Sequence, residues 1–191
     1  MNVGIVVEGD RDSAVYPELI RKIRGDVDNI NAKPCGDVIK LKSKFVGWLK
    51  HFEWHTSFSF DKALVIMDSD CSDAARWEGL LNEIYLQSGF VPSFPVHFHA
   101  TKCEVETWLL ADEGAINQVS QHRGKNKRVP AVTIQFESYR DAKELFHRVL
   151  SKAALPADAR VYQEIAAAAD IKLIAARCPS FQLFANKVLA C

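Results

Sequence analysis

Short apolar runs alternate with amphipathic segments through the first half of the chain. Three runs have the length and the β-branched or aromatic content of strands: residues 3–7, 63–67 and 94–98. Residues 30–33, before Pro34, are a further strand candidate. Between them, apolar side chains recur every three or four positions, which predicts helices from Asp12 or Ser13 to Gly25 and over residues 37–52 and 72–87. Strands that alternate with helices at this spacing are typical of a parallel sheet with helices packed against it.

The pattern changes to helices alone from Glu104 onward. Helical spacing covers residues 104–112, 138–152, 158–168 and 180–189, with breaks at Gly124, Pro130, Pro156 and Pro179. We therefore expect an α/β fold with a mainly parallel central sheet flanked by helices and a C-terminal helical portion. Residues 1–112 would form the α/β core, and residues 113–191 a helical extension packed on it within a single structural unit.

Composition and charge limit the class of protein. The chain has 191 residues, enough for one domain with a core but not for two full domains. Hydrophobic residues make up 48% and charged residues 25%, which excludes a disordered or fibrous protein. Because 24 basic residues balance 24 acidic ones, no overall field draws the protein to nucleic acid or to an anionic membrane. Any contact with a polyanion must therefore be local.

The cysteines and the N-terminus indicate the compartment. Five cysteines are scattered without a C-x-x-C pair: Cys35, Cys71, Cys103, Cys178 and Cys191. This pattern favours neither a disulfide framework nor a zinc knuckle and is typical of a reducing compartment. The first residues lack the basic flank and the apolar length of a signal peptide, and no stretch is long enough to span a bilayer. We expect a cytoplasmic protein with no membrane contact.

Acidic residues follow two of the predicted strands. Glu8 comes directly after the first strand, Asp68 directly after the third, and Asp70 two residues further on. In a parallel sheet the carboxyl ends of the strands lie at one edge, where ligands bind, and neighbouring strands are about 5 Å apart. Three carboxylates that converge there repel one another unless a cation lies among them. Hard oxygen ligands that leave room for water and phosphate favour Mg²⁺ or Mn²⁺.

Other interpretations exist for these acids and for a nearby group of metal-binding residue types. In D-S-D, Asp70 or Ser72 can cap the helix that follows, but a cap explains one acid and not three. His97 and His99 alternate on one strand near Cys103, which fits part of a zinc site but lacks a fourth ligand.

The one charge run of the chain is H-R-G-K-N-K-R, in a predicted loop. It is either a nucleic-acid contact or a solvated surface loop. Its basic side chains, which would bind phosphates, are those of Arg123, Lys125, Lys127 and Arg128.

Several motifs together resemble those of the Toprim superfamily. V-V-E-G before a helix and a later strand that ends in D-S-D match the glutamate and the Asp-x-Asp that define this superfamily, the catalytic fold of topoisomerases, primases and OLD-family nucleases. E-V-E-T-W-L-L-A-D and R-C-P-S-F, nearer the C-terminus, are similar to motifs of small stand-alone bacterial Toprim-like proteins. The resemblance implies a Toprim-like core in which Glu8, Asp68 and Asp70 form the acidic site. It also implies a second acid at Asp12, as in OLD-type members, and an ATPase partner protein in phage defence.

In a phosphoryl-transfer reaction, each of the three acids Glu8, Asp68 and Asp70 would have a role. Metal ions held by carboxylates position the reactants and neutralise charge on the phosphate and on the leaving oxygen. Asp68 and Asp70 would be metal ligands. Glu8 would be either a ligand or a general acid/base whose pKa is raised by its acidic neighbours.

The predicted helix that begins at Glu104 offers further groups at the same edge. Glu104 or Glu106 can complete a second metal position, or both can be acids placed favourably at a helix N-terminus. Because side chains two residues apart diverge on a helix, we favour Glu104, which shares a face with Trp108. Lys102, just before them, can contact a phosphate.

We therefore expect a Mg²⁺- or Mn²⁺-dependent nuclease that acts on DNA or RNA. The expected catalytic residues are Glu8, Asp68, Asp70 and Lys102. The expected metal ligands are Glu8, Asp12, Asp68, Asp70 and Glu104. The presence of all these acids favours the nuclease. The alternative is a non-catalytic Toprim-like subunit that regulates an ATPase complex, which the lack of a strong basic surface allows. A phosphatase built on D-x-D would leave Glu8 without a role.

Overall fold

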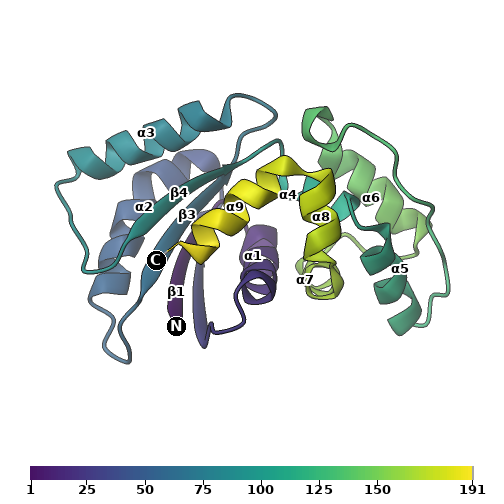
Figure 1. Cartoon of the computed structure of the whole chain (residues 1–191), viewed down its shortest axis with the longest axis horizontal. Helices are drawn as coiled ribbons and strands as arrows, with labels where there is room; N and C mark the ends of the chain where they lie inside the picture. Colours follow the sequence, from purple (N-terminus) through teal and green to yellow (C-terminus); the bar gives the residue numbers. More distant parts are fainter. Residues whose placement is uncertain (191) are drawn as a thin grey trace.

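The computed structural model describes residues 1–190. Within this range four strands form one parallel sheet in the order β2-β1-β3-β4 (Figure 1). The bounds are Asn2–Val7 for β1, Asn29–Pro34 for β2, Lys62–Asp68 for β3 and Val96–Thr101 for β4. The α/β class that the alternation of strands and helices predicted is confirmed.

The two central strands are buried on both faces. In β1, the odd-numbered apolar residues contact one hydrophobic cluster and Val6 contacts another. The helices that cover the first face are α1 (Asp10–Ile23) and α9 (Pro179–Leu189), and those that cover the second are α2 (Val38–Glu53) and α3 (Ala74–Gln87) (Figure 1). A strand covered on both sides needs apolar side chains at successive positions, which explains the continuous apolar runs of β1 and β3.

The chain after β4 is helical. Its elements are α4 (Val105–Leu110), α5 (Glu113–His122), the 3-10 turn η1 (Phe136–Ser138), α6 (Ala142–Lys152), α7 (Ala159–Ala168), α8 (Ile171–Arg177) and α9. Trp108, Phe146, Tyr162 and Phe184 belong to the same hydrophobic cluster as α1 and the face of the sheet that α1 covers. The C-terminal helices therefore share one continuous core with the sheet. None of the helices in residues 1–190 combines the length and the apolar character needed to cross a membrane.

Two of these helices, α5 and α8, are missing from the predicted set. Both begin at an aspartate cap: Asp112 accepts a hydrogen bond from Ala115 N–H, and Asp170 accepts one from Lys172 N–H. Of the seven residues of α8, all of them described, Ile174 alone is buried. So short an apolar pattern does not indicate a helix in the sequence.

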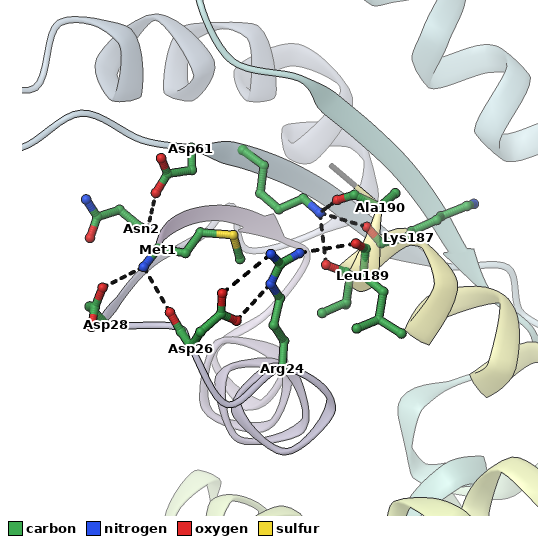
Figure 2. A network of polar contacts seen from close by, with 11 residues as sticks. Met1, Asn2, Arg24, Asp26, Asp28, Asp61, Lys187, Leu189 and Ala190 are labelled. Carbon is green, nitrogen blue, oxygen red and sulfur yellow. Dashed lines mark hydrogen bonds and ion pairs between the residues drawn. The ribbon is translucent and has the colours of Figure 1, made fainter.

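A network of polar contacts closes the amino edge of the sheet (Figure 2). The buried ammonium of Lys62, at the start of β3, donates to carbonyls at the end of α9, among them that of Val188 at 2.9 Å. The guanidinium of Arg24, just after α1, donates to the carbonyl of Leu189 at 3.1 Å. Cations at a helix C-terminus satisfy its last carbonyls and complement its dipole. The network therefore holds the end of α9 against the starts of the strands.

One pair of cysteines is bonded. Cys71 follows β3, Cys103 follows β4, and their sulfur atoms form a disulfide across 32 residues of sequence. Cys35 and Cys178 are free and buried, and Cys191 lies outside the described residues. The cysteine spacing favoured no disulfide, and this interpretation is wrong for Cys71 and Cys103. β3 and β4 are neighbours in the sheet, so the turns that follow them meet although they are distant in sequence.

Candidate functional site

Acidic residues that follow three neighbouring strands meet at the carboxyl edge of the sheet. β1 pairs with β3, and β3 pairs with β4, where Asp68 lies opposite Thr101. Glu8 follows β1 directly, and Glu104 occupies the N-cap position of α4, just after β4. The first and third strands are therefore neighbours, as the convergence of Glu8 and Asp68 requires.

We call six carboxylates at this edge the acidic cluster: Glu8, Asp12, Asp68, Asp70, Glu104 and Glu106. Electrostatic interactions join them into one unit. Burial raises the pKa of Asp68 well above its ordinary value, and the negative charges of four other cluster members raise it further. The charges of these side chains therefore act on one another across this edge of the sheet.

The pKa values of three other members of the acidic cluster are also raised. Burial raises the pKa of Asp12 to about 7, and the charges of Glu106 and Glu8 add to the rise. Burial also raises the pKa of Glu8 and of Glu104, with the charge of Asp70 acting on both. The edge of the sheet therefore holds more negative charge than its surroundings neutralise.

Asp12 reaches the cluster because α1 begins earlier than predicted. The helix starts at Asp10 with Gly9 at its N-cap, so the prediction of a cap at Asp12 or Ser13 is wrong. Glycine is accepted at an N-cap, and Asp12 then lies in the first turn. Its carboxylate accepts a hydrogen bond from Gly9 N–H at 2.8 Å. This contact turns the side chain back toward Glu8, which precedes Gly9.

Asp68 and Asp70 are not helix caps. The N-cap of α3 is Asp73, whose carboxylate accepts a hydrogen bond from Ala75 N–H at 3.0 Å. The interpretation of Asp70 or Ser72 as the cap is therefore wrong. The start of α3 needs neither Asp68 nor Asp70.

The segment after β4 holds the turn that carries Asp70. Ser69 N–H donates to the carbonyl of Thr101 at 2.9 Å, and Asp70 N–H donates to that of Cys103 at 3.1 Å. Asp70 has φ +48°, a left-handed conformation that is uncommon outside glycine, asparagine and aspartate. The chain turns here instead of continuing as an extended strand. Asp70 is consequently exposed, whereas Asp68 is partly buried.

Glu104 and Glu106 both act on the cluster. Glu104 precedes α4 with an extended backbone (φ −138°, ψ 161°), and one of its carboxylate oxygens accepts a hydrogen bond from Lys143 N–H at 2.9 Å. Glu106 lies in the first turn of α4, is buried, and accepts a hydrogen bond from the Tyr162 hydroxyl at 2.9 Å. The preference for Glu104 alone assumed that both residues are helical. That assumption is wrong because Glu104 lies outside the helix. Both charges raise the pKa of Asp68, and the choice of Glu104 as the ligand stays a prediction.

Two lysines at this edge differ in their contacts: the Lys102 ammonium is hydrogen-bonded to backbone carbonyls, and the Lys143 side chain is exposed. Lys102 donates from Nζ to the carbonyls of Ser72 at 2.8 Å and Cys71 at 3.4 Å, so its ammonium holds the turn after β3. Lys143, at the start of α6, is exposed, and its charge opposes the rise in pKa of three cluster members. It lies 39 residues after Glu104, and tertiary packing alone brings it to the site. Nothing in the sequence pattern points to it.

The basic residues of the predicted nucleic-acid contact differ in their exposure and in their contacts. Arg123 pairs with Glu164 through hydrogen bonds of 2.6 and 2.9 Å. Arg123 and Lys125 border one hollow of the surface, and Lys127 and Arg128 border another. The exposed side chains of Lys125, Lys127 and Arg128 are better placed to meet a phosphate than that of Arg123.

The interpretation of His97, His99 and Cys103 as a zinc site is wrong. Cys103 is bonded to Cys71, and a disulfide sulfur is not a thiolate ligand. His99 is buried against Trp108, with ring centroids 5.9 Å apart. Burial lowers its pKa to about 3, so its ring is a neutral part of the core.

The acidic cluster suits a hard divalent cation by its chemistry, but its side chains do not converge on one point. Carboxylate oxygens are the ligands that Mg²⁺ and Mn²⁺ prefer. Among residues 1–190, no group of three or more His, Cys, Asp or Glu side chains is placed so that it could hold a metal ion. A metal site at this edge therefore requires carboxylate side chains to change rotamer.

Comparison with known proteins gives a weak link at the level of the fold. No protein-family model matches the chain, and no curated protein matches its sequence. Among solved structures, the chain is similar to the C-terminal region of the OLD protein of Xanthomonas campestris pv. campestris, with a TM-score of 0.46 and 12% sequence identity. The similarity covers 97% of this chain and 95% of that one. At this level it says nothing about the chemistry of the acidic cluster.

Proposed function

We propose that this chain is a Mg²⁺- or Mn²⁺-dependent nuclease that hydrolyses phosphodiester bonds at the acidic cluster. The observation that supports it most is the gathering of six carboxylates at the carboxyl edge of a parallel sheet, where burial and mutual repulsion raise four pKa values. Perturbed carboxyl groups that cluster in one place are typical of functional sites. Capping of α3 does not account for Asp68 and Asp70, since Asp73 caps that helix.

The side chains that would hold the metal come from the carboxyl ends of β1 and β3, from the first turn of α1 and from the residue before α4. After rotation of their side chains, the ligands would be Asp68, Asp70, Glu8, Asp12 and Glu104. A bound Mg²⁺ or Mn²⁺ would polarise the phosphate and stabilise the leaving oxygen. Asp68 is the last residue of β3, whose other six residues are all buried.

The lysines have complementary roles in this proposal. Lys143 offers its exposed ammonium to a phosphate that approaches the cluster. Its backbone N–H donates to the Glu104 carboxylate, and this hydrogen bond keeps the start of α6 at the site. Lys102 acts indirectly by holding the turn that carries Asp70. Lys102 is therefore better described as a positioning residue than as the phosphate contact that its sequence position suggested.

The proposed substrate is DNA or RNA. Exposed Lys125, Lys127 and Arg128 supply phosphate contacts outside the acidic cluster. The Toprim-like motifs support a bacterial phage-defence or DNA-processing role with an ATPase partner protein. They do not distinguish a nuclease that acts alone from one that requires this partner.

One observation favours a second candidate function, that of a non-catalytic subunit which regulates an ATPase complex. Within residues 1–190, no three acidic side chains are placed to hold a metal as they stand. A subunit of this kind would keep the acids without using them. The two functions differ in whether the isolated chain or its complex hydrolyses nucleic acid.

Cleavage assays with and without metal test the proposal. The protein would be incubated with supercoiled and linear duplex DNA, single-stranded DNA and structured RNA, each in Mg²⁺, in Mn²⁺ and in EDTA. We expect cleavage of at least one substrate with either metal and none in EDTA, because the carboxylates alone cannot neutralise the phosphate. Cleavage that persists in EDTA would contradict the proposal. Absence of cleavage on every substrate, also in the presence of an ATPase partner, would favour the regulatory subunit.

A further inference from the structure

A chain of hydrogen bonds from the C-terminal helices holds the buried acid of the cluster. Tyr162, on α7, donates its hydroxyl hydrogen to Glu106 Oε1 at 2.9 Å. His147, on α6, places Nε2 at 2.9 Å from the same hydroxyl oxygen. Glu106 and Tyr162 are buried, so the hydrogen bond between them is shielded from water, and His147 is partly buried.

The protonation states of Tyr162 and His147 determine the direction of these hydrogen bonds. Burial, together with the charge of Glu106, raises the pKa of Tyr162, so its phenol keeps the one hydrogen that it can donate. Burial lowers the pKa of His147, so its imidazole is neutral and has one N–H at neutral pH. Because the phenol hydrogen is directed at Glu106, His147 must be the donor to Tyr162. This requires the tautomer with hydrogen on Nε2.

The Tyr162 ring is fixed from two sides. Phe146 meets it edge-on, with ring centroids 5.0 Å apart. The Arg11 guanidinium lies over the ring, 5.2 Å from its centroid, and also donates to the carbonyl of Ala157 at 3.1 Å. A ring held in this way keeps its hydroxyl at a constant position relative to Glu106.

We propose that Tyr162 and His147 are positioning residues for Glu106. They hold Glu106 Oε1 and so fix the orientation of this carboxylate beside the acidic residues that would bind the metal. The inference rests on the proposed function and deepens it, because it makes α6 and α7 part of the site. Hydrogen bonds to the outer side of metal-site groups set their orientation, and losing one typically weakens metal affinity by about 10- to 100-fold.

Mn²⁺ binding measures this role without an assay of activity. The electron paramagnetic resonance signal of free Mn²⁺ gives the dissociation constant of wild type and of Tyr162→Phe, His147→Leu and His147→Gln. We expect Tyr162→Phe and His147→Leu to weaken binding by roughly 10- to 100-fold. His147→Gln should retain most of the affinity, since its amide can replace the imidazole N–H. Tyr85→Phe is the matched control, because the Tyr85 ring packs against Phe98 in the other hydrophobic cluster.

Two further measurements test whether His147 acts on Glu106 through Tyr162. The double variant Tyr162→Phe/His147→Leu should bind Mn²⁺ no more weakly than Tyr162→Phe alone, because His147 acts through Tyr162. Nitrogen-15 NMR of the metal-free wild type should show hydrogen on Nε2 of His147. Additive losses, hydrogen on Nδ1, or a Tyr162→Phe variant that binds as tightly as wild type would overturn the inference. Failure of the wild type to bind Mn²⁺ would overturn the proposed function, and the inference with it.

Discussion

Asp68→Asn and Glu8→Gln are each expected to reduce metal-dependent cleavage by roughly 10²- to 10³-fold or more. Both replacements keep the size of the side chain and remove one negative charge from the acidic cluster. A metal that loses a charged ligand is held less tightly and less accurately, so the transition state loses both positioning and electrostatic stabilisation. Initial rates at saturating Mg²⁺ and at saturating Mn²⁺, on the substrate that wild type cleaves best, measure the loss.

Asp73→Ser is the matched control for these variants. Asp73 belongs to the same acidic segment, but it caps α3 and is not a member of the acidic cluster. Serine is also a good N-cap, so this change removes a charge and preserves the helix start. We expect wild-type cleavage. An equal loss in Asp73→Ser, or full activity in Asp68→Asn, would show that the catalytic site lies elsewhere.

Without divalent metal, the free energy of unfolding is expected to fall as the pH rises between the ordinary and the folded pKa of Asp12, from 3.8 to about 7. In this range the folded state keeps a proton that the unfolded state has released, so a higher pH favours unfolding. The slope for one such proton is at most about 1.4 kcal/mol per pH unit. Asp68, whose pKa is raised in the same direction, adds to the effect. Above the folded pKa values the loss is complete.

Denaturant unfolding in EDTA, at a series of pH values from about 5 to about 8, measures this slope. Acids in ion pairs have the opposite effect on the free energy of unfolding, which rises with pH where they titrate. Arg123 lowers the pKa of Glu164, so this acid changes the free energy of unfolding mainly below about pH 5. Asp12→Asn and Asp68→Asn should flatten the slope and exceed wild type in stability at the upper end of the series. If both variants keep the wild-type slope of unfolding free energy against pH, the claim that repulsion and burial raise the pKa values of Asp12 and Asp68 is wrong.

The positions of Glu8 and Asp68 are predictable from the sequence because they depend on local rules. A continuous apolar run indicates a strand that is buried on both faces, and such strands occur in parallel sheets. In a parallel sheet the residue after each strand lies at the carboxyl edge, whatever the rest of the chain does. The apolar runs that end at Glu8 and Asp68 therefore predict the centre of the acidic cluster.

The remaining members of the site depend on helix boundaries and on tertiary packing. Glu104 acts with Glu106 because α4 begins one residue later than the apolar pattern indicated, and a pattern does not locate a boundary to one residue. Lys143 and Tyr162 come from α6 and α7, whose amphipathic patterns show that one face is buried but not what that face meets. The disulfide of Cys71 was unpredictable for a similar reason, since it depends on the order of the strands in the sheet.

Diffraction from crystals soaked in Mn²⁺, recorded at the manganese absorption edge, tests the metal site most directly. We predict an anomalous difference peak at the carboxyl edge of the sheet, within coordination distance of Asp68 and of Glu8 or Asp70. These side chains should have rotated from the positions in which no three of the described acids can hold a metal. Soaked crystals in which the acidic cluster has no anomalous peak and its side chains are unmoved would contradict the metal site and the nuclease activity proposed from it.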